Sequence, residues 1–398
     1  MISRIRQAMA AASSTAIVLS IMTLSGLIST SMTAVPAAGT VGAKVEPSFV
    51  DPTATISGNV NLGHLVYVAP SAEIKASASP ARAISIGNES NVQDNCVVTA
   101  EAGAVRLGDM VIVAHGATVK GPASIGITGQ CKNAGPCPSF VGFNALVDGA
   151  IIEKDAMVSP LARVGPGVTI PSGRAVLPGK NITSNAEVPA KTVPVSDEDR
   201  DFMHAVIEVN IAFARQYTAL FGQSATNVRG INLNPATSFN PQSELPMLHG
   251  RRVREPGFKD RIIGDLHMAD GLDQLQKVMA TRTSLRADEG EPFDVGVIAE
   301  MKDRVTFHAL EHTHIRLGRN GHYGPGSLVH GGRTPFDDYT ITGDNFEIGE
   351  SSVFFRSRIG DNGRIGIKCL VQDCDLPAGT VVPDRTVRIK NETWPVEW

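Results

Sequence analysis

Aromatic side chains are scarce in this sequence, and neither sign of charge forms a long run. Phe, Trp and Tyr make up 5% of the 398 residues, whereas glycine occurs 39 times. Few aromatics and abundant glycine favour a repetitive β architecture with tight corners. The net charge is −4 and no long basic run occurs, so nothing indicates nucleic-acid binding. With 42% apolar residues the chain can bury a full core, and its length predicts two domains.

A second long apolar segment is also lacking, and the one that exists lies near the amino terminus. Arg4 and Arg6 precede an apolar run from Ala16 to Ile28, and Val35-Pro36-Ala37 supplies a small-residue cleavage site. The run is shorter than the roughly 20 residues that span a bilayer, which argues against the alternative of a membrane anchor. Residues 1–37 are therefore predicted to be a cleaved signal peptide, and the mature protein is expected to be periplasmic, secreted or otherwise extracytoplasmic.

Cysteine is rare, and no C-x-x-C pair occurs among the five cysteines. Metal binding by cysteine is therefore not indicated. Export permits disulfides. Cys131 and Cys137 flank a Gly/Pro-rich insertion, and Cys369 and Cys374 lie in one late loop. Either pair could form a bridge, and Cys96 is left over.

A period of six residues runs through the first half of the chain. Apolar residues recur at this spacing without a break from Val50 to Ile74, and a small or branched residue stands four places after each. The same frame returns later at Ile86, Val92, Val98, Leu107, Val113, Val119, Ile125, Val141, Val147, Ile152, Val158, Val164 and Ile170. Hexapeptide periodicity is typical of a β-helix with three short strands per turn, in which the frame residue points inward. We therefore predict an all-β, left-handed parallel β-helix whose stacked coils bury one continuous core.

The pattern changes after Val195 and returns less cleanly in the second half. Ser196 with Asp199 three residues later predicts the start of a helix, and an apolar stripe continues it to about Phe221. The stretch 222–257 is rich in Asn, Pro, Ser and Gly and is predicted to be a linker. Further frame positions are Ile348, Phe354, Ile359, Ile365 and Val371. The predicted organisation is a first β-helix over 38–221, including a flanking helix at 196–221, and a second, shortened β-helix over 258–398.

Short motifs in both halves point to one protein family. In the first half they are Asn91-Val92-Gln93-Asp94, Ala114-His115 and Gly121-Pro122. In the second half they are Leu285-Arg286-Ala287-Asp288-Glu289-Gly290, His308-Ala309-Leu310-Glu311 and Val329-His330-Gly331. In combination they resemble the γ-class carbonic anhydrases, including the related domain of carboxysome shell-organising proteins. The resemblance covers most of residues 45–221 and 280–390, and it implies two degenerate copies of the family's domain in one chain.

The resemblance implies a zinc site that is divided between these copies. In the family, zinc lies between neighbouring β-helices of a trimer, with two histidines from one subunit and the third from its neighbour. His308 and His330 match the pair, and His115 matches the third. His330 follows its inward residue by one place whereas His115 follows its own by two, so one β-helix cannot easily bring all three to one metal.

Each copy departs from the family where the other keeps its pattern. In the first copy Thr99 and Lys120 stand in place of the histidine pair, and in the second copy Pro325 stands in place of the third histidine. A lysine ammonium repels a divalent cation, so a ring of first copies alone is excluded as a three-histidine site. The complementary losses indicate one composite site at an interface between unlike domains.

The function implied by the resemblance is zinc-dependent, reversible hydration of CO2 to bicarbonate, which is the carbonate dehydratase (lyase) activity of carbonic anhydrase. Three neutral imidazoles leave a position open on the metal. Fe²⁺ is an alternative to Zn²⁺, because imidazole ligation alone does not choose between them. Gln93 is expected to orient the nucleophile, Glu289 to carry the released proton with help from Glu311, and Arg286 and Asp288 to join charge networks across the interface.

Other interpretations stay open at this point. A catalytically inactive scaffold or binding protein would resemble the shell-organising relatives, and a hexapeptide acyltransferase would use one histidine as its base. The segment from His308 to His312 also fits the H-x-x-E-H pattern of zinc proteases, but that chemistry needs a helix and the flanks favour strand. We expect trimer-type packing, in a homo-oligomer or in a hetero-oligomer with a related γ-class protein. Two domain types cannot alternate around a ring of three.

Overall fold

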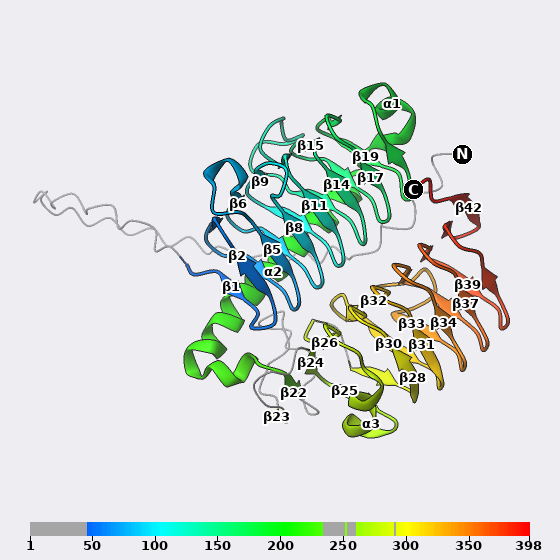
Figure 1. Cartoon of the computed structure of the whole chain (residues 1–398). Helices are drawn as coiled ribbons and strands as arrows, with labels where there is room; N and C mark the ends of the chain where they lie inside the picture. The colour runs from blue at the N-terminus through cyan, green and yellow to red at the C-terminus, as the bar shows by residue number, and fades with distance from the viewer. Residues whose placement is uncertain (1–45, 234–250, 253–259, 290–291) are drawn as a thin grey trace, which may run out of the picture. The chain divides into compact units, whose positions relative to one another are not determined.

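Short strands stacked in parallel make up most of the described chain (Figure 1). The computed structural model describes residues 46–233, 251–252, 260–289 and 292–398. The predicted signal peptide 1–37 lies outside the described residues, as does much of the predicted linker 222–257. The segment from Pro47 to Trp398 forms one compact unit.

Three sheets build the first β-helix, and we name them A, B and C. Sheet A consists of β1 (Phe49–Val50), β4 (Tyr67–Val68), β7 (Asn91–Val92), β10 (Val111–Val113), β13 (Ser139–Val141), β16 (Met157–Val158), β19 (Arg174–Val176) and the antiparallel β21 (Thr192–Pro194). Sheet B consists of β2 (Thr55–Ser57), β5 (Glu73–Lys75), β8 (Val97–Thr99), β11 (Thr118–Lys120), β14 (Leu146–Asp148), β17 (Arg163–Val164) and β20 (Asn181–Ile182). Sheet C consists of β3 (Val60–Leu62), β6 (Ile84–Ile86), β9 (Val105–Leu107), β12 (Ala123–Ile125), β15 (Ile151–Ile152) and β18 (Thr169–Ile170).

The six-residue frame forms the interior of this β-helix. In sheet A the frame residues Val68, Val92, Val113 and Val141 are partners in successive strands, and all four are fully buried. The equivalent residues of sheets B and C join the same apolar cluster. The predicted left-handed parallel β-helix is therefore confirmed, with one continuous core along its axis.

Three further sheets, D, E and F, build a second β-helix. Sheet D consists of β23 (Arg251–Arg252), β22 (Ile231–Leu233), β24 (Arg261–Gly264), β26 (Ser284–Ala287), β29 (Thr306–Ala309), β32 (Leu328–Gly331), β35 (Val353–Phe355), β38 (Leu370–Gln372), β41 (Thr386–Ile389) and β42 (Glu392–Pro395). Sheet E consists of β25 (Leu266–Met268), β27 (Phe293–Val295), β30 (His314–Leu317), β33 (Tyr339–Thr342), β36 (Arg358–Ile359) and β39 (Asp375–Leu376). Sheet F consists of β28 (Ile298–Met301), β31 (Gly321–Tyr323), β34 (Glu347–Ile348), β37 (Arg364–Ile365) and β40 (Val381–Val382).

The start of the second β-helix differs from its sequence pattern. The frame residues Ile348, Phe354 and Val371 are buried as expected. However, β22 lies inside the segment that the composition assigns to a linker, and it pairs in parallel with β24. Within the described residues, sheets D, E and F have ten, six and five strands, against eight, seven and six in sheets A, B and C. The helix α3 (Gly271–Val278) lies between β25 and β26 and interrupts the repeat of that coil.

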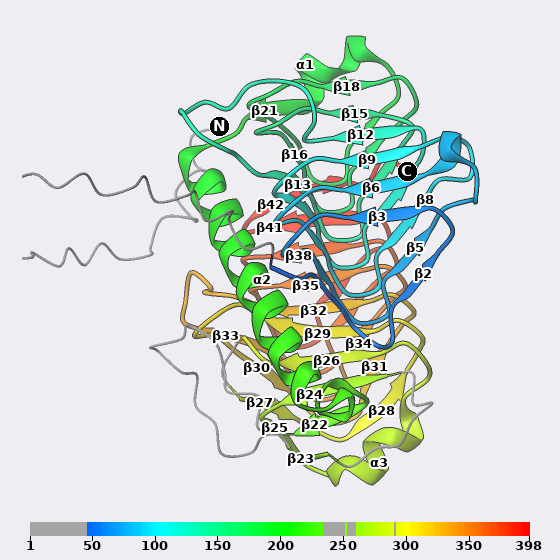
Figure 2. The same ribbon diagram turned by 90° about the vertical axis from the view of Figure 1, so that its left-hand side faces the viewer.

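A long helix, α2 (Asp197–Gln223), lies along the first β-helix and contacts β1, β4 and β10 of sheet A (Figure 2). Ser196 and Asp199 form the predicted capping box, in which each side chain accepts from the other's backbone N–H. The helix ends two residues beyond the predicted Phe221. The remaining helices are short: η2 (Pro80–Arg82), η3 (Asn185–Glu187), α1 (Val188–Lys191) and η4 (Ala225–Val228).

Sheets A and D pack against each other, and α2 covers one flank of their junction. One apolar cluster contains Ile112 and Phe140 of sheet A, Leu328 and Val353 of sheet D, and Ile207 of α2. At the far end the C-terminal tail closes the junction, where the Trp398 indole donates to the Leu161 carbonyl at 2.6 Å. The outer face of sheet A is therefore an internal surface of the molecule.

The sequence leaves open which of two cysteine pairs forms a disulfide, and the structure contains one of them. Cys131 and Cys137 form a disulfide, whereas Cys369 and Cys374 are free and buried, as is Cys96. Among the described helices, none combines the length and apolarity that crossing a bilayer requires.

Candidate metal centre

Three imidazoles converge at the junction of sheets A and D. His308 in β29 and His330 in β32 are register partners on sheet D, so their side chains stand on the same face one coil apart. His115 follows β10 in the turn out of sheet A. The three ring centroids lie 5.0 to 5.2 Å apart, and one nitrogen of each ring lies within 4.8 Å of the others. All three residues are buried, and the structure thus brings together the histidines that the sequence assigns to different copies.

The contacts of two rings fix the nitrogen that each can offer. The Nδ1 of His330 lies 2.7 Å from the Gly331 carbonyl, which can only accept, so Nδ1 carries the proton and Nε2 keeps a lone pair. The Nδ1 of His115 lies 3.1 Å from a carboxylate oxygen of Asp94, an acceptor that favours the same protonated nitrogen. Burial lowers the pKa of all three histidines, most strongly for His308 and His330. The rings are therefore neutral, which is the form that binds a metal.

The spacing of two of these nitrogens fits a divalent cation. The Nδ1 of His308 lies 3.3 Å from the Nε2 of His330. Two nitrogens bound to one tetrahedral Zn²⁺ at about 2.05 Å stand about 3.3 Å apart. On its other side His308 Nε2 faces Arg286 at 3.1 Å, Glu289 at 3.4 Å and Asp288 at 3.5 Å. The Nδ1 edge of the His308 ring therefore faces His330, and its Nε2 edge faces the charged side chains of Arg286, Asp288 and Glu289.

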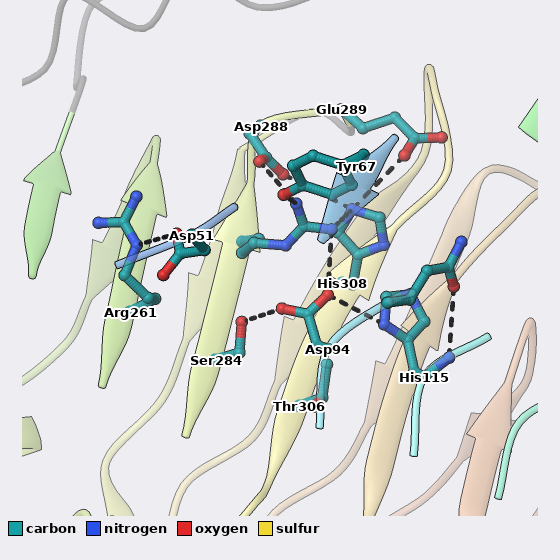
Figure 3. Close-up of polar contacts among 12 residues, drawn as sticks. Asp51, Tyr67, Asp94, His115, Arg261, Ser284, Asp288, Glu289, Thr306 and His308 are labelled. Atoms are coloured by element: carbon teal, nitrogen blue, oxygen red, sulfur yellow. Dashed lines mark hydrogen bonds and ion pairs between the residues drawn. The ribbon is translucent and has the colours of Figure 1, made fainter. Parts of the chain in front are cut away.

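Asp94 connects the two β-helices beside this centre (Figure 3). Its carboxylate contacts His115 Nδ1 and, at 3.2 Å, the guanidinium of Arg286 from sheet D, and it accepts a hydrogen bond from Ser284. Burial alone would raise the pKa of Asp94, but Arg286 and the His115 ring lower it well below the ordinary value. Arg286 also pairs with Asp288 at 3.0 Å. The charge network that the resemblance implies thus spans the junction and holds His115 in place.

Two tyrosines that the sequence analysis did not single out complete this network. The Arg286 guanidinium donates to the hydroxyl of Tyr67 at 2.8 Å and lies 5.3 Å from the ring of Phe213. Tyr217 of α2 donates its hydroxyl to Asp288. Tyr67 occupies an outward position next to an inward frame residue, and Tyr217 belongs to the predicted apolar stripe. Neither pattern distinguishes a polar role from simple packing.

The imidazoles line a small pocket of about 20 Å³ whose walls are largely aromatic. Phe143 stacks on His115 at 5.7 Å, and Phe355 meets His330 edge-on at 5.3 Å. Phe140, Phe202 and Leu310 complete the apolar walls, and Gln93, Glu289 and Asn210 supply polar atoms. Phe355 and Asn210 are further residues that sequence patterning missed, because neither belongs to a motif of the resemblance.

One of the two predicted proton-carrying residues lines this pocket. Glu289 lines it and is buried, and burial, reinforced by Glu311 and Asp288, raises its pKa well above the ordinary value. Gln93 also lines the pocket, and its side-chain oxygen accepts from the backbone N–H of His115 at 3.3 Å. The carboxylates and Gln93 therefore flank the imidazoles from different β-helices.

Two of the residues that replace family histidines, Thr99 and Lys120, lie on a sheet away from this centre. Thr99 and Lys120 are register partners in β8 and β11 of sheet B, which does not face sheet D. Pro325 is exposed and precedes β32. His308 lies in a strand and His312 follows it in a turn, so the two cannot share a helix face as a zinc-protease motif requires.

Comparisons with known proteins agree with this geometry. The chain is 31% identical over 197 residues to a carbonic anhydrase from Methanosarcina thermophila, which covers 44% of this chain and 74% of that protein. The chain belongs to the γ-class carbonic anhydrase family. It is also 31% identical over 249 residues to the carboxysome assembly protein CcmM of a Nostoc species, covering 56% of this chain but 42% of that protein. A mitochondrial γ carbonic anhydrase 2 of Arabidopsis thaliana is 32% identical over 133 residues, 31% of this chain and 43% of that protein.

Solved structures resemble this γ-class chain only loosely. A hexapeptide transferase family protein from Anaplasma phagocytophilum matches 44% of this chain and 95% of its own at 24% identity, with a TM-score of 0.32. An Arabidopsis UDP-N-acetylglucosamine acyltransferase matches 87% of this chain and 74% of its own at 12% identity, with a TM-score of 0.21. No protein-family model matches the chain.

Proposed function

We propose that this protein catalyses the reversible hydration of CO2 to bicarbonate at a composite metal site between its two β-helices. His115 of the first copy and His308 and His330 of the second would hold the ion, with Zn²⁺ as the expected metal and Fe²⁺ as the alternative. The observation that carries the proposal is the convergence of three buried, neutral imidazoles from two copies that are each incomplete.

The chemistry divides between the ion and the chain. A divalent metal on three neutral imidazoles supplies the Lewis acidity that makes a water molecule nucleophilic near neutral pH. The aromatic walls offer an apolar surface to CO2, which is uncharged and carries no hydrogen to donate. Gln93 offers its amide N–H to orient an oxygen in the pocket, while its carbonyl oxygen is held by the His115 backbone.

Glu289 is placed to take up and release the proton. Its carboxylate lies at the pocket, and its raised pKa brings proton uptake closer to neutral pH, where a proton carrier works best. Glu311 is close enough to contribute to this raised pKa and is half-buried, so it offers the next position toward solvent. Arg286 and Asp288 position the groups around His308 without entering the pocket lining.

Metal analysis of single-histidine variants tests the composite site. The purified protein is expected to hold about one metal ion per chain, and His308→Ala and His115→Ala should each lose it. His322→Ala is the matched control, because this ring is half-exposed on sheet F and makes only a distant contact with Glu300. Full metal retention by His115→Ala would show that the first copy contributes no ligand. CO2 hydration, followed by stopped-flow pH indicator, should fall at least 100-fold in both metal-deficient variants and not in the control.

A catalytically inactive binding or scaffold protein is the second candidate, since the chain is also similar to CcmM. This alternative predicts normal metal content without CO2 hydration. A hexapeptide acyltransferase would retain transfer activity after the metal is removed, because a histidine base needs no metal. The same preparations therefore separate the three functions.

Assembly and location are further parts of the proposal. The junction uses sheet A of one copy and sheet D of the other, which are different faces, so the contact is heterologous and leaves sheets B and F for further partners. A homo-oligomer, or a hetero-oligomer with a related γ-class protein, would form through these faces, and light scattering of the native complex distinguishes them. We propose an exported, extracytoplasmic location, for which the mature N-terminus and cell fractionation provide the test.

A further inference from the structure

The flank of the junction opposite α2 carries two columns of residues with positive φ. Strand registers place the first column in the turns from sheet A to sheet B, at Ser71, Asn95, Gly116, Asn144, Leu161 and Gly179. They place the second in the turns from sheet F to sheet D, at Arg282, Arg304, Gly326, Ser351, Lys368 and Arg385. Left-handed backbone is uncommon for arginine and lysine. The second column is nevertheless mainly basic, whereas the first carries no charge.

Two asparagines of the first column hold the second column in place. The Asn95 amide N–H groups donate to the Arg304 carbonyl at 3.2 Å and to the Thr306 hydroxyl at 2.9 Å. Those of Asn144 donate to the carbonyls of Gly326 at 3.1 Å and Ser351 at 3.0 Å. Because carbonyl oxygens can only accept, these contacts fix which way each amide faces.

A cavity of about 260 Å³ opens between the columns where their side chains are small. Gly116 and Gly326 have no side chain there, and Ser351 has a short one, whereas long basic residues stand above and below in the second column. His115 lines this cavity and also the metal pocket. The cavity therefore lies behind the metal centre, on the side away from the aromatic walls.

The polar groups at the cavity suit a ligand that both donates and accepts hydrogen bonds. Asn95 Oδ1 and Ser327 Oγ are buried, and neither has a hydrogen-bonding partner within the part of the chain that the structure describes. Since the amide of Asn95 is fixed by its two donated bonds, its oxygen can only accept. The Ser327 hydroxyl can donate. Buried polar atoms of this kind ordinarily find a partner, either water or a ligand.

The charges around the cavity favour an anion. Arg304 lines it and shares the single carboxylate of Glu73 with Arg282, so that two guanidinium groups meet one negative charge. One coil beyond Ser351, the pKa of Lys368 is lowered by burial and then by the neighbouring Arg385. The Glu350 carboxylate also lines the cavity and offsets part of this positive charge, but it is exposed to solvent.

We propose that this cavity is a second binding site, separate from the metal, for a small oxyanion that carries a hydroxyl group. The identity of the anion as bicarbonate rests on the proposed function, whereas the site itself does not. A bicarbonate ion would accept from Ser327 and Arg304 and donate its hydroxyl toward Asn95. The product of CO2 hydration would thus have a place to bind beside His115 without displacing a ligand of the metal.

A matched pair of substitutions at Ser351 tests the site. Asp and Asn both tolerate left-handed backbone and have nearly the same size, so Ser351→Asp and Ser351→Asn differ in charge alone. Bicarbonate and nitrate are titrated by calorimetry into the full-length protein as purified and after removal of metal by dipicolinate. Wild type and Ser351→Asn should bind bicarbonate within about twofold of each other, with and without metal, while Ser351→Asp should bind it at least tenfold more weakly. Nitrate, which has no hydroxyl, should bind less tightly than bicarbonate.

The outcomes separate this site from the catalytic proposal. Absence of bicarbonate binding to the metal-free wild type, or equal binding by the two Ser351 variants, would overturn the second site whatever the activity. Nitrate binding as tight as bicarbonate binding would overturn its assignment to hydroxyl-bearing anions. Anion binding that persists in a protein without CO2 hydration would instead sink the catalytic proposal alone. If Ser351→Asp does not fold, Ser327→Ala replaces it, with an expected threefold to tenfold loss of bicarbonate affinity.

Discussion

Two buried ion pairs join the β-helices, and only one of them touches an imidazole. Asp94 pairs with Arg286 at 3.2 Å, and Asp51 pairs with Arg261 at 2.9 Å. All four side chains are at most 1% exposed. Asp94 also contacts the Nδ1 of His115, whereas Arg261 donates to Asp51, Asn232 and a backbone carbonyl. Replacing each aspartate by asparagine therefore separates stability of the junction from support of the metal centre.

The expected loss of stability is similar for both substitutions. At an effective dielectric constant near 20, unit charges 3.2 Å apart attract by about 5 kcal/mol. Breaking a buried pair costs about 3–5 kcal/mol. Asparagine keeps the volume, Arg286 keeps Asp288, and Arg261 keeps its two other acceptors. We therefore expect Asp94→Asn and Asp51→Asn each to lower the free energy of unfolding by about 3 kcal/mol, measured in urea on metal-free protein.

Metal affinity should distinguish the two variants. A neutral asparagine can present either end of its amide to His115, so the ring loses the charge that fixes Nδ1 as the protonated nitrogen. Loss of such a supporting carboxylate weakens metal binding about 10-fold to 100-fold. Competition with a chelator should show this loss for Asp94→Asn and a change of less than about threefold for Asp51→Asn. Equal affinities in the two variants would refute the claim that Asp94 supports the metal centre through His115.

Further predictions concern stability. Tyr217→Phe removes a hydrogen bond to the charged Asp288 and should lower the free energy of unfolding by about 2 kcal/mol in urea titrations. Chelation should lower the thermal midpoint, because a bound metal at 1,000 times its Kd stabilises the folded state by about 4 kcal/mol. Replacing both Cys131 and Cys137 by serine opens a short loop and should cost about 2 kcal/mol. Lys191 and Lys180 lower the pKa of Glu397 to about 2, although burial opposes them. The contribution of Glu397, about 1 kcal/mol after screening, should be present above pH 4 and lost as the pH falls toward 2, so Glu397→Gln should match wild type only in acid.

The sequence predicts the buried interior of each β-helix better than the contacts between the two β-helices. Inward positions such as Val92 and Val113 recur every six residues because each must fill the same small triangular cross-section. This requirement is visible in the spacing of apolar residues along the sequence. Outward positions obey no such rule. Phe355 and Tyr67 each stand next to an inward residue, and only the packing of sheet A on sheet D gives them a role. Their contribution to the site is therefore a property of the junction and not of either repeat.

The histidines could be found because their chemistry restricts residue type more strongly than packing does. The resemblance named His115, His308 and His330, and the position of His115 two residues past its inward valine indicated a different corner from that of His330. The sequence could not predict which residue of one β-helix contacts which residue of the other. Asp94 belongs to a recognised motif, but its link to Arg286 depends on which faces meet. The coils that begin at β22 and β24 escaped detection because β22 lies in a segment whose composition indicates a linker, and no regular six-residue frame precedes Arg286 in the second half.

The use of unlike faces gives a physical account of the complementary losses. Sheet A of the first copy meets sheet D of the second, so the first copy presents the turn that carries His115 and the second presents the strands that carry His308 and His330. Thr99 and Lys120 stand on sheet B, which has no imidazoles opposite it in this junction. A lysine there would not repel a metal held by the three histidines, because these converge on another face. Thr99 and Lys120, which remove the histidine pair from the first copy, therefore remove no ligand from the junction between sheets A and D. A site of three histidines needs only one such junction per chain.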